Sequence, residues 1–277
     1  MAYLKQYILH KTGLLNFYNY WLFSGLHLFL MKWKNRSQWD EIKNEDLFYS
    51  GLLSSLKKSD ALIFDIGANY GWTTLTFLKF SSQVIAYEPD INNLKILRYR
   101  FGDTNRLVIE AKAISNNIDG AVFYQNRNSS ALNTLSLKWV DALTNGVYRE
   151  KKIFSSEKYK VETSTLDIEM KKYGKPVFLK VDVEGHEYSV FEGLHSSIPL
   201  VVFEANLPEF VDETFDIINQ LVKLDQKTTF NYSYGYQIVL GNYISGDEMK
   251  ALIKDLSYHC IDIVSRSSEY EVYFNAS

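Results

Sequence analysis

The fold of this chain is decided by the stretch ALIFDIGANYG at residues 61–71. Its first four residues form a short apolar run that predicts a buried strand, and its two glycines permit a tight turn with close backbone approach to a ligand. Apolar residues then recur at helical spacing over Trp72–Phe80, and Val84–Tyr87 predicts a second strand that leads into Glu88. A strand, a glycine turn, a helix and a second strand closing on an acid describe one half of a nucleotide-binding α/β fold.

The spacing of the glycines indicates which nucleotide is bound. A dinucleotide pyrophosphate favours Gly-x-Gly-x-x-Gly, whereas this turn reads Asp65-x-Gly67-x-x-x-Gly71. A carboxylate beside the ligand repels phosphate but suits a cofactor that carries an amino group and a sulfonium. Glu88, about 20 residues after Gly67, is placed to accept hydrogen bonds from ribose hydroxyls. The pattern therefore predicts S-adenosylmethionine, with an ordinary α/β protein carrying a glycine turn as the alternative.

Strands and helices alternate along most of the remaining chain, which predicts a parallel sheet built by right-handed crossovers. An Asp-Gly pair before Ala121 is typical of a hairpin turn. Residues 126–157 are polar and irregular, apart from one short helix near Leu135–Leu143, and a loop this long is usually functional or mobile. Further strands are expected at Leu107–Ala113, Ala121–Tyr124, Val177–Val181, Leu200–Phe203, within residues 230–243 and at Tyr270–Phe274, and further helices over residues 165–174, 188–194 and 211–224.

Acidic residues fall at the predicted carboxyl ends of four strands. In an open α/β sheet, ligands bind beside that edge. The sequence therefore places the functional site at a rim that carries Asp65, Glu88, Asp182 and Glu204.

Size and composition are those of one large globular domain. The chain has 277 residues, and its single cysteine, Cys260, excludes an intramolecular disulfide and a multi-cysteine zinc site. No signal peptide is visible, so a cytoplasmic location is expected. Residues 1–36 hold five basic residues and no acid, which leaves 25 basic and 33 acidic residues, a balance of −8, in the rest. Nothing in that acidic remainder suggests nucleic-acid binding.

Residues 12–31 form a run of 20 residues without formal charge, flanked by lysines and interrupted by four polar residues. Three interpretations stay open: a helix packed on the domain or on a partner, a helix in a membrane interface, and a true span. We expect residues 1–50 to form a basic, aromatic helical extension and residues 51–277 to form the main domain. Peripheral contact with the inner face of a membrane through residues 1–36 belongs to the second interpretation.

A second motif narrows the class. Residues 179–187 read LKVDVEGHE and are followed by Gly193. Together with Asp65–Gly71 and the Tyr87-Glu88-Pro89 run, this block resembles the FkbM family of S-adenosylmethionine-dependent methyltransferases over roughly half the chain. The resemblance implies a class I methyltransferase fold, which is a Rossmann-like α/β fold with a seven-stranded, mostly parallel sheet and helices on both faces. It also implies O-methylation of a saccharide or another small hydroxylated metabolite.

The motifs assign the residues that bind the cofactor. The first turn, with Asp65, is expected to hold the methionine part and Glu88 the ribose; a helix-capping acid and a surface acid are the alternatives. Adenine is expected near the end of the third strand, at residues 113–115. The predicted cofactor-binding residues are Asp65, Gly67, Asn69, Gly71, Glu88, Ser115 and Asp182.

Catalysis needs little from the protein beyond position. Methyl transfer from a sulfonium is an in-line displacement, so orientation of the acceptor supplies much of the rate. An alcohol acceptor also needs a general base within hydrogen-bond reach. The resemblance places Asp182 where the fourth strand meets the acceptor, and His186 lies one helical turn further on, so these two form the predicted catalytic pair. The alternatives are a helix cap or cofactor contact for Asp182 and a structural role for His186.

A hard divalent cation could be gathered by carboxylates in the same part of the chain. Acids that cap the following helix and satisfy buried N–H groups are the favoured alternative, so no metal is predicted. The residues concerned are Asp182, Glu184, Glu187 and Glu204.

The predicted function is S-adenosylmethionine-dependent O-methylation of a small-molecule or glycan acceptor. An NAD-dependent oxidoreductase on the same architecture and a non-catalytic cofactor-binding or scaffold protein are the alternatives. The carboxylate of Asp65 and the missing third glycine oppose the first of these. Residues 126–157 and Tyr232, Tyr234 and Tyr236 are candidates for the acceptor pocket, with ordinary core or surface aromatics as the alternative. The oligomeric state stays open.

Overall fold

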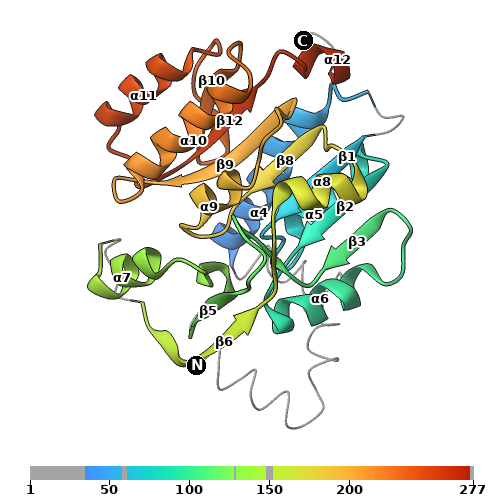
Figure 1. Ribbon diagram of the computed structural model, residues 1–277, viewed down its shortest axis with the longest axis vertical. Coiled ribbons are helices and arrows are strands. Elements are labelled where there is room, and N and C mark those ends of the chain that lie inside the picture. Colours follow the sequence, from blue (N-terminus) through green and yellow to red (C-terminus); the bar gives the residue numbers. More distant parts are fainter. Residues whose placement is uncertain (1–34, 58–60, 128, 148–151, 275–277) are drawn as a thin grey trace.

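The computed structural model describes residues 35–57, 61–127, 129–147 and 152–274. Its centre is a mixed eight-stranded sheet in the order β11-β10-β12-β9-β8-β1-β2-β3 (Figure 1). Neighbouring strands from β9 to β3 run parallel, whereas β12 is antiparallel to both β9 and β10. The strands are β1 (Leu62–Ile66), β2 (Gln83–Tyr87), β3 (Leu107–Glu110), β8 (Phe178–Val181), β9 (Leu200–Asn206), β10 (Thr229–Tyr234), β11 (Gln237–Ile238) and β12 (Cys260–Arg266).

Helices cover both faces of the sheet, as predicted, because the strand residues alternate between two apolar cores. Leu62, Phe64 and Ile66 of β1 lie in one core, and Ile63 lies in the other. The first core is covered by α8 (Leu166–Tyr173), α9 (Glu187–Glu192), α10 (Val211–Leu224) and α11 (Gly246–Asp255), and the second by α4 (Arg36–Leu53), α5 (Trp72–Phe80) and α6 (Ile91–Phe101).

Short polar side chains fix where several of these helices begin. Asp90 accepts a hydrogen bond from the backbone N–H of Asn92 at 2.7 Å, at the start of α6. Ser245 and Glu248 form a reciprocal capping box at the start of α11. The helices predicted over Trp72–Phe80 and over residues 165–174 and 211–224 are confirmed within a residue or two, as α5, α8 and α10.

The predicted number of seven strands is wrong by one. The eighth strand, β11, pairs with β10 through a two-residue turn in which Gly235 and Tyr236 both have positive φ, +57° and +64°. This is the turn geometry that matches the twist of antiparallel strands, and it favours small residues. Because a tyrosine stands at its second position, the sequence carried no hairpin signal there.

Two further predictions fail between the end of β3 and the segment drawn below the sheet in Figure 1, which is called the ribbon here. The strand predicted at Leu107–Ala113 ends at Glu110, and the chain then joins a separate two-stranded pairing of β4 (Ala113–Ile114) with β7 (Thr163–Ser164). The Asp-Gly turn at Gly120 does not close a hairpin. Instead the following strand pairs with a segment much later in the chain. The ribbon consists of β5 (Ala121–Asn126), η2 (Ser130–Leu132), α7 (Leu137–Asn145) and β6 (Phe154–Val161).

The strand predicted at Tyr270–Phe274 is also wrong, because this segment contains the short helix α12 (Tyr270–Tyr273). The rings of Tyr270 and Phe274 stack at 4.4 Å between centroids, four residues apart, which a helical turn allows and a strand does not. The antiparallel strand beside β9 is β12, whose sequence includes the polar Asp262 and Ser265.

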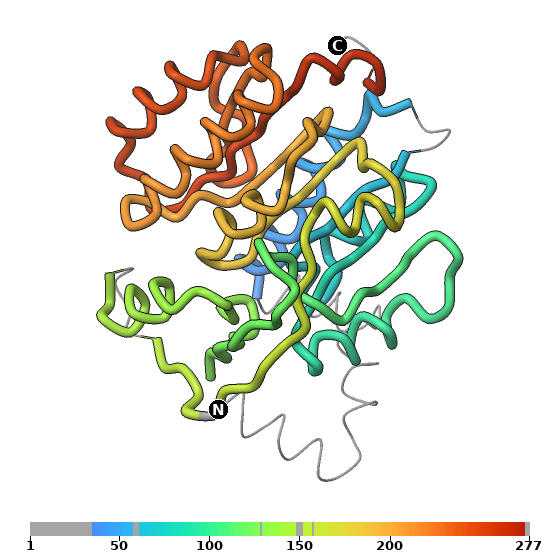
Figure 2. The backbone as a smooth tube through the Cα atoms, viewed as in Figure 1, coloured from blue at the N-terminus to red at the C-terminus, as the bar shows by residue number. Residues whose placement is uncertain are grey.

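Helix α4, blue in Figure 2, crosses one face of the sheet. One face of its second half is buried, and the Tyr49 ring packs against Phe77 and Phe178 at centroid distances of 5.2 and 6.1 Å. The helix runs across residue 50, so the division predicted there stays an expectation. The predictions for residues 12–31 lie outside the described residues. Among the helices that the structure describes, none is long and apolar enough to cross a membrane.

We predict that Leu53→Ala lowers the free energy of unfolding by about 2–5 kcal/mol, because Leu53 is fully buried between α4 and the sheet. Chemical denaturation measures the change. Leu47→Ala is the matched control on the same helix, since Leu47 is 57% exposed. Equal effects of the two substitutions would show that α4 does not belong to the core.

Candidate active site

The turn after β1 touches the end of β8. Gly67 has φ +82°, and a Cβ added there would lie 1.8 Å from the carbonyl oxygen of Asp182. Its N–H and that of Ala68 both donate to the carbonyl oxygen of Tyr87, at 3.0 and 3.1 Å. The turn therefore has room for no side chain at Gly67, and it joins the ends of β1, β2 and β8.

Asp65 lies beneath this turn. Its Oδ2 accepts hydrogen bonds from the hydroxyls of Thr74 and Thr73, at 2.6 and 3.2 Å, so one oxygen holds the start of α5. Its Oδ1 has no hydrogen-bond partner and lies 3.8 Å from the Nζ of Lys180. Burial raises the pKa of Asp65, while Lys180 lowers it. Two cavities lie at this site and are described below, and Asp65 is in the lining of neither. Its direct contact with the cofactor therefore stays a prediction.

Lys180 is a central residue that sequence reasoning missed. Its buried Nζ donates to the carbonyl oxygen of Gly67 at 3.2 Å and lies 3.1 Å from Oδ2 of Asp182. The negative charges of Asp182 and Asp65 raise the pKa of Lys180 despite its burial. The signal that could have found it is a lysine in the middle of an apolar strand, since such a buried charge needs partners.

Glu88 and Asn69 form the second part of the turn. The Oε2 and Oε1 of Glu88 accept hydrogen bonds from the backbone N–H groups of Asn69 and Asp90, at 2.8 and 2.7 Å. Burial raises the pKa of Glu88 to about 7. Asn69 has φ +48°, and its buried Oδ1 has no hydrogen-bond partner among the described residues. A buried acceptor without a donor is costly unless a ligand supplies one.

A small cavity of about 110 Å³ lies between Glu88 and the end of β8. His186 lines it, and its Nε2 lies 3.0 Å from the hydroxyl of Ser115. Burial lowers the pKa of His186 to about 4, so the ring is neutral at physiological pH. The remaining walls of the small cavity are largely apolar and include Ile66, Ala113, Ile114, Phe123, Leu135 and Val183.

A larger cavity of about 630 Å³ adjoins the small one. It is bounded by α4, by the turn after β1, by the ribbon and by Tyr236. Asp182 lines both cavities, whereas His186 lines the small one and is absent from the described lining of the larger one. The residues that line both are Gly67, Asn69, Ser130, Ala131, Asn133 and Asp182.

Of the three tyrosines predicted near an acceptor, one lies at this cavity. Tyr236 is part of its lining. Tyr232 is buried in the first core, and Tyr234 is half exposed and stacks on Tyr258 at 3.9 Å. Several residues of the predicted 126–157 loop also line the cavity, among them Arg127 and Ser155.

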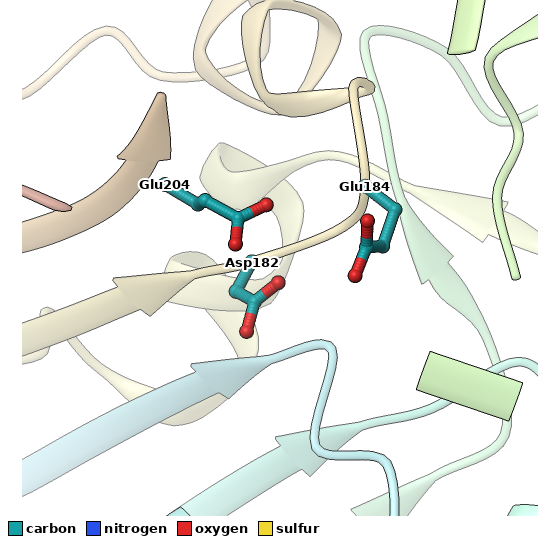
Figure 3. A group of neighbouring side chains, drawn as sticks. All are labelled: Asp182, Glu184 and Glu204. Atoms are coloured by element: carbon teal, nitrogen blue, oxygen red, sulfur yellow. The ribbon is translucent and has the colours of Figure 1, made fainter. Parts of the chain in front are cut away.

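Three carboxylates gather at the ends of β8 and β9. Figure 3 shows the side chains of Asp182, Glu184 and Glu204 pointing toward one another, and one oxygen of each lies within 4.8 Å of the others. Glu204 lies inside β9, which continues to Asn206, and not at a strand end after Phe203 as predicted. A hard cation such as Mg²⁺ accepts oxygen ligands in this arrangement.

Glu187 has a different task. Its Oε1 accepts hydrogen bonds from the backbone N–H groups of Val183 and Gly185, at 2.9 and 3.2 Å. It therefore holds the turn between β8 and α9, as the capping alternative expected. Burial raises its pKa to about 7.

Protonation can relieve the mutual repulsion of these three carboxylates, just as a bound cation can. Burial raises the pKa of Glu184 and of Glu204 well above the usual value, and repulsion from Asp182 raises both further. The absence of a metal stays a prediction.

The comparison with protein families settles the class. The model of the methyltransferase FkbM domain matches residues 65–238, which is more than half of the chain. The chain belongs to this family. As an FkbM-domain methyltransferase, it uses S-adenosylmethionine as cofactor.

Solved structures and curated proteins add little to this assignment. Similar structures include a precorrin-6y C5,15-methyltransferase from Geobacter metallireducens (8% identity, 78% of this chain and 85% of that one, TM-score 0.39). Others are an rRNA methylase from Streptococcus thermophilus (9%, 78% and 91%, 0.38) and a Streptococcus mutans protein solved in complex with SAH (8%, 80% and 94%, 0.33). The search of curated proteins found no significant match.

The residues present fit this cofactor. The unpartnered Oδ1 of Asn69 lies at the junction of the two cavities, where it can accept a hydrogen bond from an amino or hydroxyl group. Glu88 offers carboxylate oxygens beside the small cavity, which suits a ribose diol.

We predict that Glu184→Gln stabilises the protein at high pH. Because the folded-state pKa of Glu184 is raised, its contribution to stability is present below the unfolded pKa and is lost as the pH rises. Glutamine stays neutral, so the variant should gain about 2–4 °C in Tm at about pH 8 and nothing near pH 4.

Thermal unfolding in EDTA measures this effect, with exposed Glu271→Gln as the control. The same gain at both pH values would contradict it. A rise in wild-type Tm on adding Mg²⁺, absent in the variant, would show that a cation rather than protons balances the cluster.

Proposed function

We propose that this FkbM-domain protein O-methylates a small hydroxylated acceptor such as a saccharide. One observation carries the proposal: the small and larger cavities meet at Asn69 and Asp182. A cofactor that extends from the small cavity would present its methyl group to an acceptor in the larger one, beside the carboxylate of Asp182.

The small cavity suits the adenosine part of the cofactor. Its apolar walls match the faces of an adenine ring, and Glu88 can accept hydrogen bonds from the ribose hydroxyls. His186 and Ser115 stand at the adenine end, joined at 3.0 Å. We therefore assign His186 to the wall of the cofactor pocket, and the role of a catalytic base stays with Asp182.

Asp182 is the residue placed to remove the acceptor proton. When bound, the cofactor supplies an electrophilic methyl group on a sulfonium. Asp182 lies in the lining of both cavities and can accept the proton that the hydroxyl loses as its oxygen forms the new bond. Lys180, at 3.1 Å, orients the carboxylate of Asp182, whose side chain is 38% exposed, and this ion pair compensates the buried charge of Lys180.

The larger cavity supports a hydroxylated acceptor, because amide and hydroxyl side chains match the hydrogen-bonding groups of a polyol. Three rings, those of Tyr70, Trp72 and Tyr236, add apolar surface for the faces of a sugar. The neutral polar residues of its lining are Gln38, Asn69, Thr73, Asn92, Asn93, Gln125, Asn126, Ser129, Ser130, Asn133 and Ser155.

The family match bears differently on the two alternative functions that the sequence left open. Family membership does not favour the NAD-dependent oxidoreductase. A non-catalytic cofactor-binding protein would share both cavities, so turnover is what separates it from an enzyme. That nucleic acid is not the acceptor stays a prediction drawn from the acidic balance of residues 37–277.

We predict that Glu88→Gln weakens S-adenosylmethionine binding about 10- to 100-fold, because charge-assisted hydrogen bonds to the ribose are lost. Isothermal titration calorimetry measures the affinity. Glu162→Gln, at a side chain that is 70% exposed, is the control. Unchanged affinity in a folded Glu88→Gln protein would remove Glu88 from the cofactor site.

Asp182→Asn should separate chemistry from binding. We expect turnover to fall about 100-fold or more, since a general base contributes on this scale, while cofactor affinity changes by less than about threefold. Transfer of labelled methyl groups to a panel of monosaccharides measures turnover, with exposed Asp212→Asn as the control.

The outcome pattern discriminates between roles for Asp182. Lost affinity with the turnover of bound protein intact would assign it to the cofactor. No turnover by the wild type on any acceptor, with cofactor binding intact, would favour the non-catalytic alternative.

A further inference from the structure

Helix α4 brings a carboxylate into the larger cavity from outside the methyltransferase motifs. Glu45 is partly buried and lines this cavity together with Lys180 and Asp182. Among the described residues, it has no hydrogen-bond or ion-pair partner. The family match begins at Asp65, so Glu45 lies outside the region that the family shares. An unpaired carboxylate in a cavity wall is available to a ligand.

The charges that face Glu45 come from three strands of the sheet. Lys180 of β8 is the facing cation, and it is already paired with Asp182 at 3.1 Å. Asp65 of β1 and Asp262 of β12 add further negative charge. Burial raises the pKa of Glu45 to about 8; Lys180 lowers it, and the three aspartates raise it. Glu45 therefore ionises near neutral to mildly alkaline pH.

Burial raises the pKa of the neighbouring Asp262 to about 6, so Asp262 is largely ionised before Glu45 titrates. The tyrosine rings beside Glu45 stay neutral in this range. Burial raises the pKa of Tyr49, on the same helix, and of Tyr236, on the β10–β11 turn. Two more charged residues line the cavity at its rim, Glu41 on α4 and Arg127 on the ribbon, and both are exposed to solvent. Glu45 therefore contributes the main change in charge at the inner wall at mildly alkaline pH.

Tyr236 fixes the geometry of this wall. Its φ of +64° is unfavourable for a bulky residue, and the conformation is held by packing of its ring against Phe48 of α4, at 6.3 Å between centroids. The strained turn thus brings Tyr236 into the cavity lining, where the charge of Glu45 acts on its ring.

We propose that Glu45 determines acceptor specificity: its carboxylate accepts hydrogen bonds from hydroxyl groups of an uncharged acceptor and keeps anionic acceptors out of the larger cavity. The proposal rests on the proposed function, because it takes the larger cavity as the acceptor site. Uronates and sugar phosphates are the chemical classes that it excludes.

The test compares glucose with glucuronate on protein saturated with S-adenosylhomocysteine. Saturation-transfer NMR gives the affinity ratio of the two probes at about pH 6.5 and about pH 9, on either side of the ionisation of Glu45. We expect the wild type to disfavour glucuronate about tenfold more at the higher pH, since like charges in a low-dielectric cavity repel. In Glu45→Gln the ratio should not change with pH.

Asp40→Asn provides a matched control. Asp40 lies on the same helix, its side chain is 52% exposed, and it does not belong to the cavity lining. The control should keep the wild-type dependence on pH. A pH-independent ratio in the wild type, or a pH dependence retained in Glu45→Gln, would overturn the proposal.

Failure of this proposal can be told apart from failure of the proposed function. If the wild type binds both probes but their affinity ratio does not change with pH, the role of Glu45 fails while the proposed function stands. If S-adenosylhomocysteine binds but neither probe does, the assignment of the larger cavity to a sugar acceptor fails as well. If the wild type does not bind S-adenosylhomocysteine, the proposed function itself is contradicted.

Discussion

The contact on which the site depends is the approach of Gly67 to the carbonyl oxygen of Asp182. A methyl group at Gly67 would lie 1.8 Å from that oxygen, so the backbone of the turn after β1 is in direct contact with the backbone at the end of β8. Lys180 reinforces the junction because it bonds the carbonyl of Gly67 and the carboxylate of Asp182 at once. These contacts join the turn after β1 directly to Asp182, the residue that lines both cavities.

The sequence predicted those parts of the fold whose signals are local. The turn at Gly67, the helix that follows it and the acids at strand ends are recognised from a few neighbouring residues. The pairing of strands could not be predicted in this way, because β5 pairs with a strand that begins about 30 residues later and β12 inserts between β9 and β10. No short window contains those pairings, which is why the hairpin at Gly120 and the strand at Tyr270–Phe274 were predicted wrongly.

In the candidate site too, residues with a local sequence signal were predicted and residues placed by long-range contacts were not. Asp182 and Glu88 follow apolar strands and could be placed at the rim without a structure. Lys180 stood in the motif but was not weighed as a charge that needs partners. Glu45 offered no signal at all, because on an amphipathic helix its position does not differ from that of an ordinary solvated acid. Its place in the cavity follows from how α4 crosses the sheet.

The loop of residues 129–133 links the two cavities in a further way. Ser130, Ala131 and Asn133 line both of them, and Asp90 holds this loop through the side-chain amide of Asn133 at 2.7 Å. If the two cavities take the proposed cofactor and acceptor, a displacement of this loop by one ligand would alter the site of the other. Thermodynamic reciprocity would then require each ligand to change the affinity of the other by the same factor.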